Sequence, residues 1–474
     1  MVDGRLEQIV SAIGPRRVVV ISDRYPPDAA GGAELSLHIL LREDPLRDQA
    51  LVVTFDKAIA LPERRLVDGV EIVALPMSAA WPLHRLSQHE VDRLKRLSEG
   101  VKWRKFIGEA LALGVRRPRI HGPALALWIA GPPAGGIRMA HATVPEGRGQ
   151  PELRTILHQV RPELVHADNA RSIMMAADIL ADDDTPLVAL VRDHRFTSLQ
   201  FDQSLTPPPG AAGLSLRGRL AMTCAKAALA YRQARLKRAT VVIATSQHVT
   251  DTLAPVLGDG RLRRLPLEPV ELPGHSLAVV GRDAFSILVV GSLTHNKGQF
   301  QLLRAWPEIV SRIPNATMDF AGRGPAHQAM QAFVKQQGLQ SRVRMHGHLG
   351  SEALQKLYRD CDVVALPTLW SEPFGRVPLE AGAAGRPVVA YGSGGLVETV
   401  LDGVTGRLIE RGDRTAFVTA LADLAGDPEA RERMGEAGRA RVVEAYAPMR
   451  LAKLLASVWD EVGGRPDRRT AAHG

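Results

Sequence analysis

The second half of the chain alternates short, mostly apolar segments with stretches of helical periodicity, and this alternation is what most constrains the fold. Short runs rich in Val, Ile, Leu and Ala are typical of strands that are buried on both faces of a parallel sheet. Such strands are expected at 287–291, 317–321, 343–345, 362–366 and 387–390, with helices between them. Repeated strand–helix units of this kind predict an α/β domain with a doubly wound parallel sheet over residues 282–447.

The first half of the chain repeats this pattern more loosely. Apolar runs predict further strands at 17–22, 51–55, 70–75, 162–167, 187–191 and 240–246. Residues 260–281 are rich in Arg, Pro, Leu and Gly and have no clear period, which indicates an interdomain linker. We therefore expect two Rossmann-like domains that face a cleft, the first over residues 1–265 and the second over residues 282–447.

Length and composition agree with a two-domain, soluble globular protein. A chain of 474 residues is too long for one compact core. The two cysteines, Cys224 and Cys361, lie far apart, so neither a disulfide framework nor a cysteine zinc site is expected. The first residues lack the features of a signal peptide, and the longest continuously apolar run is too short to span a bilayer. These features predict a cytoplasmic protein.

The formal net charge of +9 is compatible with nucleic acid, anionic membranes or acidic substrates. No nucleic-acid-binding module is recognisable, so no nucleic acid partner is expected. Seven basic residues and no acidic one lie between Arg217 and Arg238. Such a helix could make a peripheral contact with the anionic inner face of a membrane. It could equally be a solvated helix that crosses the first domain, and both interpretations stay open.

Two carboxylates, Glu372 and Glu380, lie eight positions apart on either side of a Pro-Phe-Gly turn. Pro378 predicts the start of a helix, because proline in a first helical turn costs no hydrogen bond. The backbone N–H groups of residues 375–377 would then point out of the helix N-terminus, where a phosphate binds readily. A carboxylate one turn further in can reach vicinal hydroxyls. The stretch therefore predicts a site for a phosphate flanked by two polyols, as in a nucleotide sugar.

This segment, with the Gly31-Gly32 pair and Lys297-Gly298, resembles the retaining GT-B glycosyltransferases of family four (glycosyl transferases group 1) and their E-x7-E motif. The resemblance is strong over 287–446 and looser before. It implies a GT-B fold, a UDP- or GDP-linked sugar donor and a glycan or lipid-linked acceptor. The product would be a cell-surface polysaccharide or glycolipid. The GT-B fold also implies that a helix over 448–463 packs back towards the first domain, and the tail 464–474 is expected to be disordered.

The resemblance implies roles for individual residues. Glu372 would contact the transferred sugar, and Glu380 would contact the ribose. Lys297 would bind and stabilise the leaving diphosphate, which the Gly32 loop would also face. The other donor-binding candidates lie within the same motif: Phe374, Gly375, Arg376 and Val377.

The sequence departs from the family pattern at two places. Ser292 stands where the family has an arginine that binds the diphosphate, and Arg323 or Arg376 could compensate. Asp193 matches the acidic member of a catalytic pair, but His194 comes one residue after it, so a catalytic and a structural His194 both stay open.

No D-x-D motif or histidine cluster has metal-ligand spacing, so we expect a metal-independent enzyme without a cofactor. Two other functions remain possible from the sequence. One is an inactive nucleotide-sugar-binding module, suggested by Ser292, and the other is a GT-B-fold nucleotide-sugar epimerase. Residues 76–149 carry no readable motif and are a candidate for part of the acceptor surface.

Overall fold

The structure is a computed structural model that describes residues 2–27, 32–56, 58–76, 151–198, 226, 229–271 and 284–464. Several sequence predictions therefore lie outside the described residues. These are the candidate acceptor surface after Pro76, the first part of the basic segment, Cys224 and the tail from 465 onwards.

The described strands of the first domain form a sheet in the order β3-β4-β2-β1-β5-β6-β7-β8. All neighbours are parallel except β3 and β4, which form an antiparallel edge. The strands are β1 (Val18–Ser22), β2 (Ala50–Asp56), β3 (Glu63–Val67), β4 (Val70–Pro76), β5 (Leu164–Asp168), β6 (Leu187–Val191), β7 (Val241–Ala244) and β8 (Leu262–Arg264). The helices are α1 (Val2–Ile13), α2 (Gly32–Leu41), α7 (Pro151–Val160), α8 (Asn169–Ile179) and α10 (Gln247–Leu257), with short 3-10 turns η2 (Leu180–Asp182), η3 (His194–Phe196) and η5 (Asp259–Arg261).

Strand β1 shows how this sheet is covered on both faces. Val19 and Ile21 pack into one core with residues of α1, α7 and α8. Val18 and Val20, on the opposite face, pack into another core with residues of α2 and the C-terminal helix. Because both faces are apolar, the strands read as continuous hydrophobic runs rather than as alternating ones.

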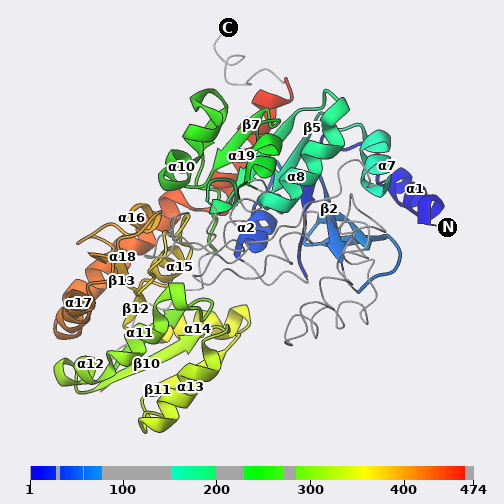
Figure 1. Cartoon of the computed structure of the whole chain (residues 1–474). Coiled ribbons are helices and arrows are strands. Elements are labelled where there is room, and N and C mark those ends of the chain that lie inside the picture. Colours follow the sequence, from blue (N-terminus) through cyan, green and yellow to red (C-terminus); the bar gives the residue numbers. More distant parts are fainter. Residues whose placement is uncertain are drawn as a thin grey trace, which may run out of the picture.

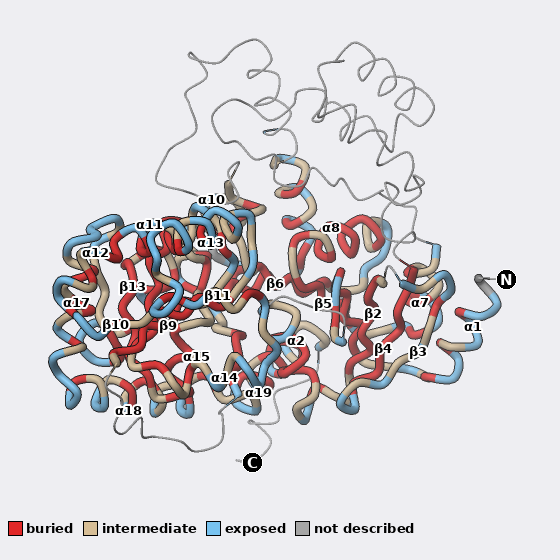
Figure 2. The backbone as a smooth tube through the Cα atoms, turned by 90° about the horizontal axis from the view of Figure 1, so that it is seen from below, coloured by how far each residue is buried: buried red, intermediate tan, exposed pale blue. Residues whose placement is uncertain are grey.

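The second domain carries a fully parallel sheet in the order β11-β10-β9-β12-β13-β14. Its strands are β9 (Phe285–Val290), β10 (Ala316–Ala321), β11 (Val343–Gly347), β12 (Val363–Leu366), β13 (Val388–Tyr391) and β14 (Gly406–Ile409). Its helices are α11 (Gln299–Arg304), α12 (Trp306–Arg312), α13 (His327–Gln336), α14 (Ser351–Asp360), α15 (Val377–Ala383), α16 (Leu396–Thr399), α17 (Arg414–Gly426) and α18 (Pro428–Ala445), with η6 (His295–Lys297). Figure 2 shows buried backbone throughout both sheets and in helices such as α8. The expectation of two doubly wound α/β domains is confirmed.

The last helix, α19 (Pro448–Val462), returns from the second domain and packs against the first (Figure 1). Leu455 and Trp459 are buried in the same core as Val18 and Leu37. The Trp459 Nε1–H donates to Nδ1 of His166 on β5, with a separation of 3.3 Å. The chain therefore crosses between the domains twice.

The linker prediction at 260–281 is wrong at its start. Strand β8 lies within it and pairs with β7 in parallel register, with Leu262 opposite Val242. A three-residue strand containing two arginines has too few apolar residues to be recognised from its sequence.

No helix among the described residues is long and apolar enough to cross a membrane.

Candidate active site

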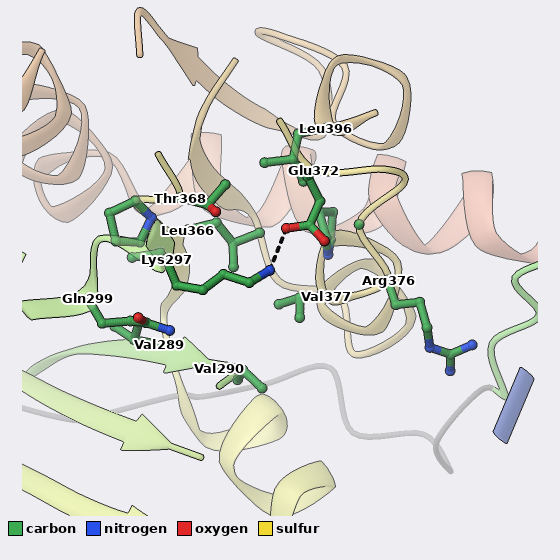
Figure 3. A pocket seen from close by; sticks show the side chains of 15 residues that line it. Val289, Val290, Lys297, Gln299, Leu366, Thr368, Glu372, Arg376, Val377 and Leu396 are labelled. Carbon is green, nitrogen blue, oxygen red and sulfur yellow. Dashed lines mark hydrogen bonds and ion pairs between the residues drawn. The ribbon is translucent and has the colours of Figure 1, made fainter. Parts of the chain in front are cut away.

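A pocket lies at the carboxyl ends of the second-domain strands β9 and β12, where parallel sheets bind ligands. Its wall combines the ends of these strands, the loops that follow them and the start of α15. The lining residues are Val289, Val290, Gly291, Lys297, Gln299, Ala365, Leu366, Pro367, Thr368, Glu372, Gly375, Arg376, Val377, Pro378 and Leu396. Figure 3 shows Lys297 and Glu372 pointing toward one another, whereas Arg376 points away from them.

Lys297 and Glu372 form an ion pair in this pocket. The Lys297 Nζ lies 2.5 Å from Oε2 of Glu372, and the indole N–H of Trp370 donates to the same oxygen at 2.7 Å. The Lys297 Nζ also lies 4.9 Å from the centre of the Trp370 ring, within cation–π range. Since the two charged side chains are 25% and 17% exposed, solvent and ligands can reach them. Two of the predicted catalytic residues therefore meet in one site.

Backbone contacts explain why a glycine follows Lys297. Gly298 has φ +69°, and a Cβ at this position would lie 1.9 Å from the carbonyl oxygen of Pro367. The N–H groups of Leu369 and Trp370 donate to the carbonyl of Asn296 at 2.8 and 3.2 Å. The loop after β9 is thus held against the loop after β12, and this contact positions Lys297 beside Glu372.

The sequence analysis did not identify Gln299 and Trp370 as site residues. Gln299 is buried and lines the pocket, and its Nε2 donates to the carbonyl of Ser292 at 3.0 Å. The signal that the sequence offers for Gln299 is its amide side chain directly after Lys297-Gly298. Ser292 itself is not among the lining residues, and its backbone rather than its side chain supports the wall.

Arg376 extends from the start of α15 into the first domain. Its Nη1 donates to Oγ of Ser36. The same Nη1 donates to the carbonyl of Pro269 at 3.1 Å and lies 3.4 Å from Oε2 of Glu268. Gly32 lies beside it, since a Cβ there would be 3.0 Å from Cδ of Arg376. In this structure Arg376 connects the two domains and does not stand next to Lys297.

Arg323 also lies away from Lys297. It borders a second depression after β10 and β11, together with His327 and His346. Neither of the two arginines considered as substitutes for the missing cation therefore adjoins Lys297.

Other motif residues occupy different surroundings. Gly375 and Val377 line the pocket, and a Cβ on Gly375 (φ +94°) would lie 2.5 Å from a methyl carbon of Leu396. Phe374 does not line it. Its buried ring packs edge-on against Tyr446, with 6.1 Å between the ring centres, in the core between the domains.

Glu380 lies on α15, outside the set of lining residues. The hydroxyl of Tyr358 donates to its Oε2 at 2.8 Å, and Nε of Arg376 lies 3.4 Å from its Oε1. Burial raises the pKa of Tyr358 far above its ordinary value, so the phenol stays protonated and keeps donating. The carboxylate is consequently fixed in place while 26% of its side chain remains exposed.

His194 and Asp193 follow β6, but they lie in different contacts. The buried His194 places Nε2 2.9 Å from the carbonyl of Ser371, the residue before Glu372. Burial lowers the pKa of His194, which favours the neutral ring, and since a carbonyl only accepts, Nε2 carries the proton. Asp193 instead pairs with Arg195 at 3.2 Å. Of these two candidates, His194 reaches the loop that carries Glu372.

The described part of the basic segment, 229–238, faces the first domain. Arg235 forms an ion pair with Asp178 at 3.0 Å, and Arg238 donates to the carbonyl of Ala177 at 2.9 Å. Arg232 is buried and donates to the carbonyl of Arg195 at 2.6 Å. These contacts are those of a helix that crosses and packs on the domain.

Comparisons with known proteins relate the second domain to a family of transferases. Residues 280–441 match the family model described as "Glycosyl transferases group 1". The GDP-mannose-dependent alpha-(1-6)-phosphatidylinositol monomannoside mannosyltransferase of Mycolicibacterium smegmatis is 38% identical over 159 residues, which cover 32% of this chain and 42% of that relative. The D-inositol 3-phosphate glycosyltransferase of Streptomyces coelicolor is 34% identical over 201 residues, which cover 40% of this chain and 44% of that relative. The chain spans less than half the length of these relatives.

Solved structures resemble the chain over almost its whole length. Sucrose-phosphate synthase from Thermosynechococcus elongatus superposes with a TM-score of 0.66 at 18% identity, covering 94% of this chain and 99% of the other. HepE from Anabaena, solved with UDP-glucose, superposes with a TM-score of 0.59 at 17% identity, covering 94% of this chain and 99% of HepE. At these identities the likeness shows the shared fold. The GT-B fold of these structures extends over both domains, whereas the match to the group 1 glycosyl transferases covers residues 280–441, in the second domain.

Proposed function

We propose that the protein is a retaining glycosyltransferase that moves a hexose-type sugar from a UDP- or GDP-linked donor to a glycan or lipid-linked acceptor. The observation that carries this proposal is the Lys297–Glu372 ion pair, exposed in a pocket of a group 1 domain. A cation and a carboxylate side by side suit a ligand that presents a diphosphate and sugar hydroxyls together.

Lys297 has the role of stabilising the leaving diphosphate. In the structure Glu372 neutralises Lys297, with 2.5 Å between Nζ and Oε2. When a diphosphate enters, the lysine exchanges this partner for a phosphate oxygen, and the released carboxylate accepts hydrogen bonds from the sugar. Charge stabilisation of the leaving group is often the largest single contribution to catalysis.

Retention is proposed to follow from attack on the face that the diphosphate leaves. The acceptor oxygen forms a bond to the anomeric carbon while the bond from that carbon to the diphosphate oxygen breaks. The acceptor proton moves to the departing diphosphate, so no enzyme nucleophile is consumed. Trp370 and Lys297 both bind Oε2 of Glu372, which favours a sugar-binding role for this carboxylate over attack on the anomeric carbon.

His194 is proposed as a positioning residue. Its contact with the Ser371 carbonyl at 2.9 Å holds the loop that carries Glu372 against the first domain. Glu380, held by Tyr358 at 2.8 Å, is proposed to bind the ribose hydroxyls.

Incubation with UDP- and GDP-sugars and a panel of acceptors tests the proposal. We expect transfer from one nucleotide class, with the anomeric configuration of the donor kept when the product is examined by NMR. Catalysis without a metal is part of the proposal, so the rate should not change with EDTA. An inverted product, or EDTA-sensitive transfer, would contradict the corresponding part of this mechanism.

A second candidate is an inactive module that binds a nucleotide sugar. Among the described residues that line the pocket, the basic side chains are those of Lys297 and Arg376, and Arg376 contacts Glu268 and Ser36 of the first domain. If one cation is too little for catalysis, the donor would bind without turnover on any acceptor.

A further inference from the structure

A second ligand position is indicated in the first domain by the order of its strands. From β1 the sheet grows in one direction to β2 and in the other to β5, so the order reverses between β1 and β5. In open parallel sheets, ligands bind outside the carboxyl ends of the strands at such a reversal. Residues just after β1, β5 and the adjacent β6 therefore face this position.

Arginines follow all three strands. Arg24 comes two residues after β1, Arg171 three after β5 and Arg195 four after β6. Arg24 is exposed, whereas Arg171 and Arg195 are partly buried, with side chains 24% and 25% exposed. Three guanidinium groups are thus gathered at one edge of the sheet.

Among the described residues, two aspartates lie beside these arginines. The Arg171 Nη1 lies 3.4 Å from Oδ2 of Asp23, whose other oxygen accepts from the amide of Asn169 at 2.6 Å. Asp193 pairs with Arg195 at 3.2 Å. Arg171 and Arg195 are therefore each held beside an aspartate, and Arg24 adds a third guanidinium group to the cluster.

Two additional observations show that the arginines lie close to one another. The buried Arg232 donates to the backbone carbonyl of Arg195 at 2.6 Å, which brings a fourth arginine to the group. Burial lowers the pKa of Arg171, and the charges of Arg195 and Arg24 lower it further. An anion bound between these side chains would offset their mutual repulsion.

We propose that Arg24, Arg171 and Arg195 bind the phosphate group of the acceptor substrate, so that the acceptor is a phosphorylated sugar or polyol, either free or as a lipid headgroup. This inference rests on the transferase function proposed above and names its acceptor class. Guanidinium groups suit this ligand, because their planar fork binds two phosphate oxygens at once.

The location fits an acceptor. His194 immediately precedes Arg195 in the chain and contacts the carbonyl of Ser371, next to Glu372. A phosphate held by the arginines would leave the remainder of the acceptor near the loop that carries Glu372, where the donor sugar is proposed to bind.

Calorimetric titration without a donor tests the anion site. Glucose 6-phosphate and glycerol 3-phosphate are compared with glucose and glycerol, and with inorganic phosphate. We expect at least one phosphorylated compound to bind, and to bind about tenfold or more tightly than its neutral counterpart. Arg171→Gln and Arg195→Gln should each raise its Kd by about tenfold, the effect of losing one charged hydrogen-bonding group. Equal binding of phosphorylated and neutral compounds, or a Kd unchanged in both variants, would overturn the proposal.

Arg161→Gln is the matched control. Arg161 is exposed and precedes β5, at the opposite edge of the same sheet. The Arg161→Gln substitution removes one positive charge from the same domain, and the variant should bind the phosphorylated compound with the Kd of the wild type. If a glutamine variant does not fold, Arg171→Lys and Arg195→Lys replace it, since lysine keeps the charge but lacks the bidentate geometry.

Vesicles distinguish the two sources of the phosphate. Sedimentation with phosphatidylinositol in phosphatidylcholine vesicles is compared with phosphatidylcholine alone. Binding that is lost in Arg171→Gln and displaced by glucose 6-phosphate assigns a lipid headgroup, whereas tight binding of the soluble phosphates without sedimentation assigns a free acceptor. Sedimentation that both variants retain, without binding of soluble phosphates, overturns the site.

Nucleotide titrations on the same variants separate this inference from the proposed function. UDP and GDP should bind the arginine variants as they bind the wild type. If no nucleotide binds any of these proteins, the transferase proposal fails, while the acceptor titrations still decide whether the arginines form an anion site. A nucleotide affinity lost together with the sugar phosphate would show that these arginines belong to the donor site, and would overturn their assignment to the acceptor.

Discussion

Lys297 is held in its pocket by a carboxylate on one side and an indole ring on the other. Both contacts involve residues of the loop after β12, which Gly298 brings close to the lysine. A partly exposed ion pair is worth little on its own, because solvent screens it. Glu372 can therefore be exchanged for an incoming phosphate at low cost.

Replacing Lys297 by alanine should lower kcat by about a hundredfold or more, since no other basic side chain of the described pocket lining adjoins the proposed leaving group. Lys335→Ala, which removes an exposed lysine on α13, is the control and should leave kcat unchanged. Steady-state kinetics with the identified donor would measure both. Equal rates for the wild type and Lys297→Ala would remove the lysine from the mechanism.

Gly298→Ala should lower the thermal midpoint and weaken donor binding, because the added Cβ would lie 1.9 Å from the Pro367 carbonyl and φ is +69°. Gly338→Ala is a matched control. Gly338 has nearly the same φ, +66°, but a Cβ added there would meet no atom within 4 Å. Gly338→Ala should lower the free energy of unfolding only by the backbone strain, about 1 kcal/mol. If both variants behave alike, the contact with Pro367 does not fix the loop.

At this scale the sequence indicates which residue types are present more reliably than where their side chains point. Lys297 and Glu372 were predicted and do meet, because each follows a buried strand whose position was predictable. Phe374 lies two residues from Glu372, yet it enters the core, since direction within a short loop depends on the neighbouring domain. Trp370 was missed because an indole beside a carboxylate has no sequence spacing to recognise.

At the scale of elements, the contact between α19 and β5 joins the C-terminus to the first domain. Trp459 and His166 are both fully buried and hydrogen-bonded through Nδ1 of the histidine. Burial, assisted by the charge of Arg192, lowers the pKa of His166 to about 3. The ring is therefore neutral in the folded protein over the whole range in which an unfolded histidine becomes charged.

This burial predicts a pH-dependent stability. Below about pH 6.5 the unfolded chain binds a proton that the folded chain excludes, so the free energy of unfolding falls as the pH falls. One such group contributes about 1.4 kcal/mol per pH unit until the folded pKa is reached. His166→Asn keeps an acceptor for the indole but does not titrate. Urea midpoints between about pH 5 and 7 should therefore fall more steeply for the wild type than for the variant. Parallel curves would show that His166 does not titrate on unfolding.

The predictability of an element depends on its composition. The central parallel strands were predicted because they are buried on both faces and contain mainly Val, Ile, Leu and Ala. Strand β3 was missed because it is a partly exposed antiparallel edge with charged residues, and β8 because it has three residues. Both β3 and β8 form through backbone pairing with a neighbouring strand, and the local sequence does not encode this pairing.

For the whole molecule, several contacts between the domains involve the loop that carries Glu372. Ser371 accepts from His194, the Pro373 carbonyl accepts from Ser246 at 2.5 Å, and Arg376 reaches Glu268 and Ser36. The position of Glu372 is therefore coupled to how the two domains sit against each other.

Glu268 should matter most among these contacts. Glu268 is buried and pairs with Arg192, whose side chain is 6% exposed. It also lies 3.4 Å from Nη1 of Arg376. Glu268→Ala should lower the free energy of unfolding by about 3 kcal/mol, because breaking a buried ion pair leaves a charge without its partner. Arg192 would keep its second pair, with Asp168 at 2.8 Å. Glu271→Ala is the control, because Glu271 is 46% exposed in its pair with Arg42 and should cost less than about 1 kcal/mol. Denaturant unfolding would compare them, and equal losses would refute a structural role for Glu268.

Calorimetric titration with UDP, GDP, ADP and their sugar conjugates tests the proposed donor site. One nucleotide class should bind the wild type, and Glu380→Ala should raise its Kd by about tenfold or more by removing the proposed ribose contact. Glu352→Ala, an exposed carboxylate on α14, should bind as the wild type does. Binding of no nucleotide, or one Kd shared by all three proteins, would contradict the donor site described above.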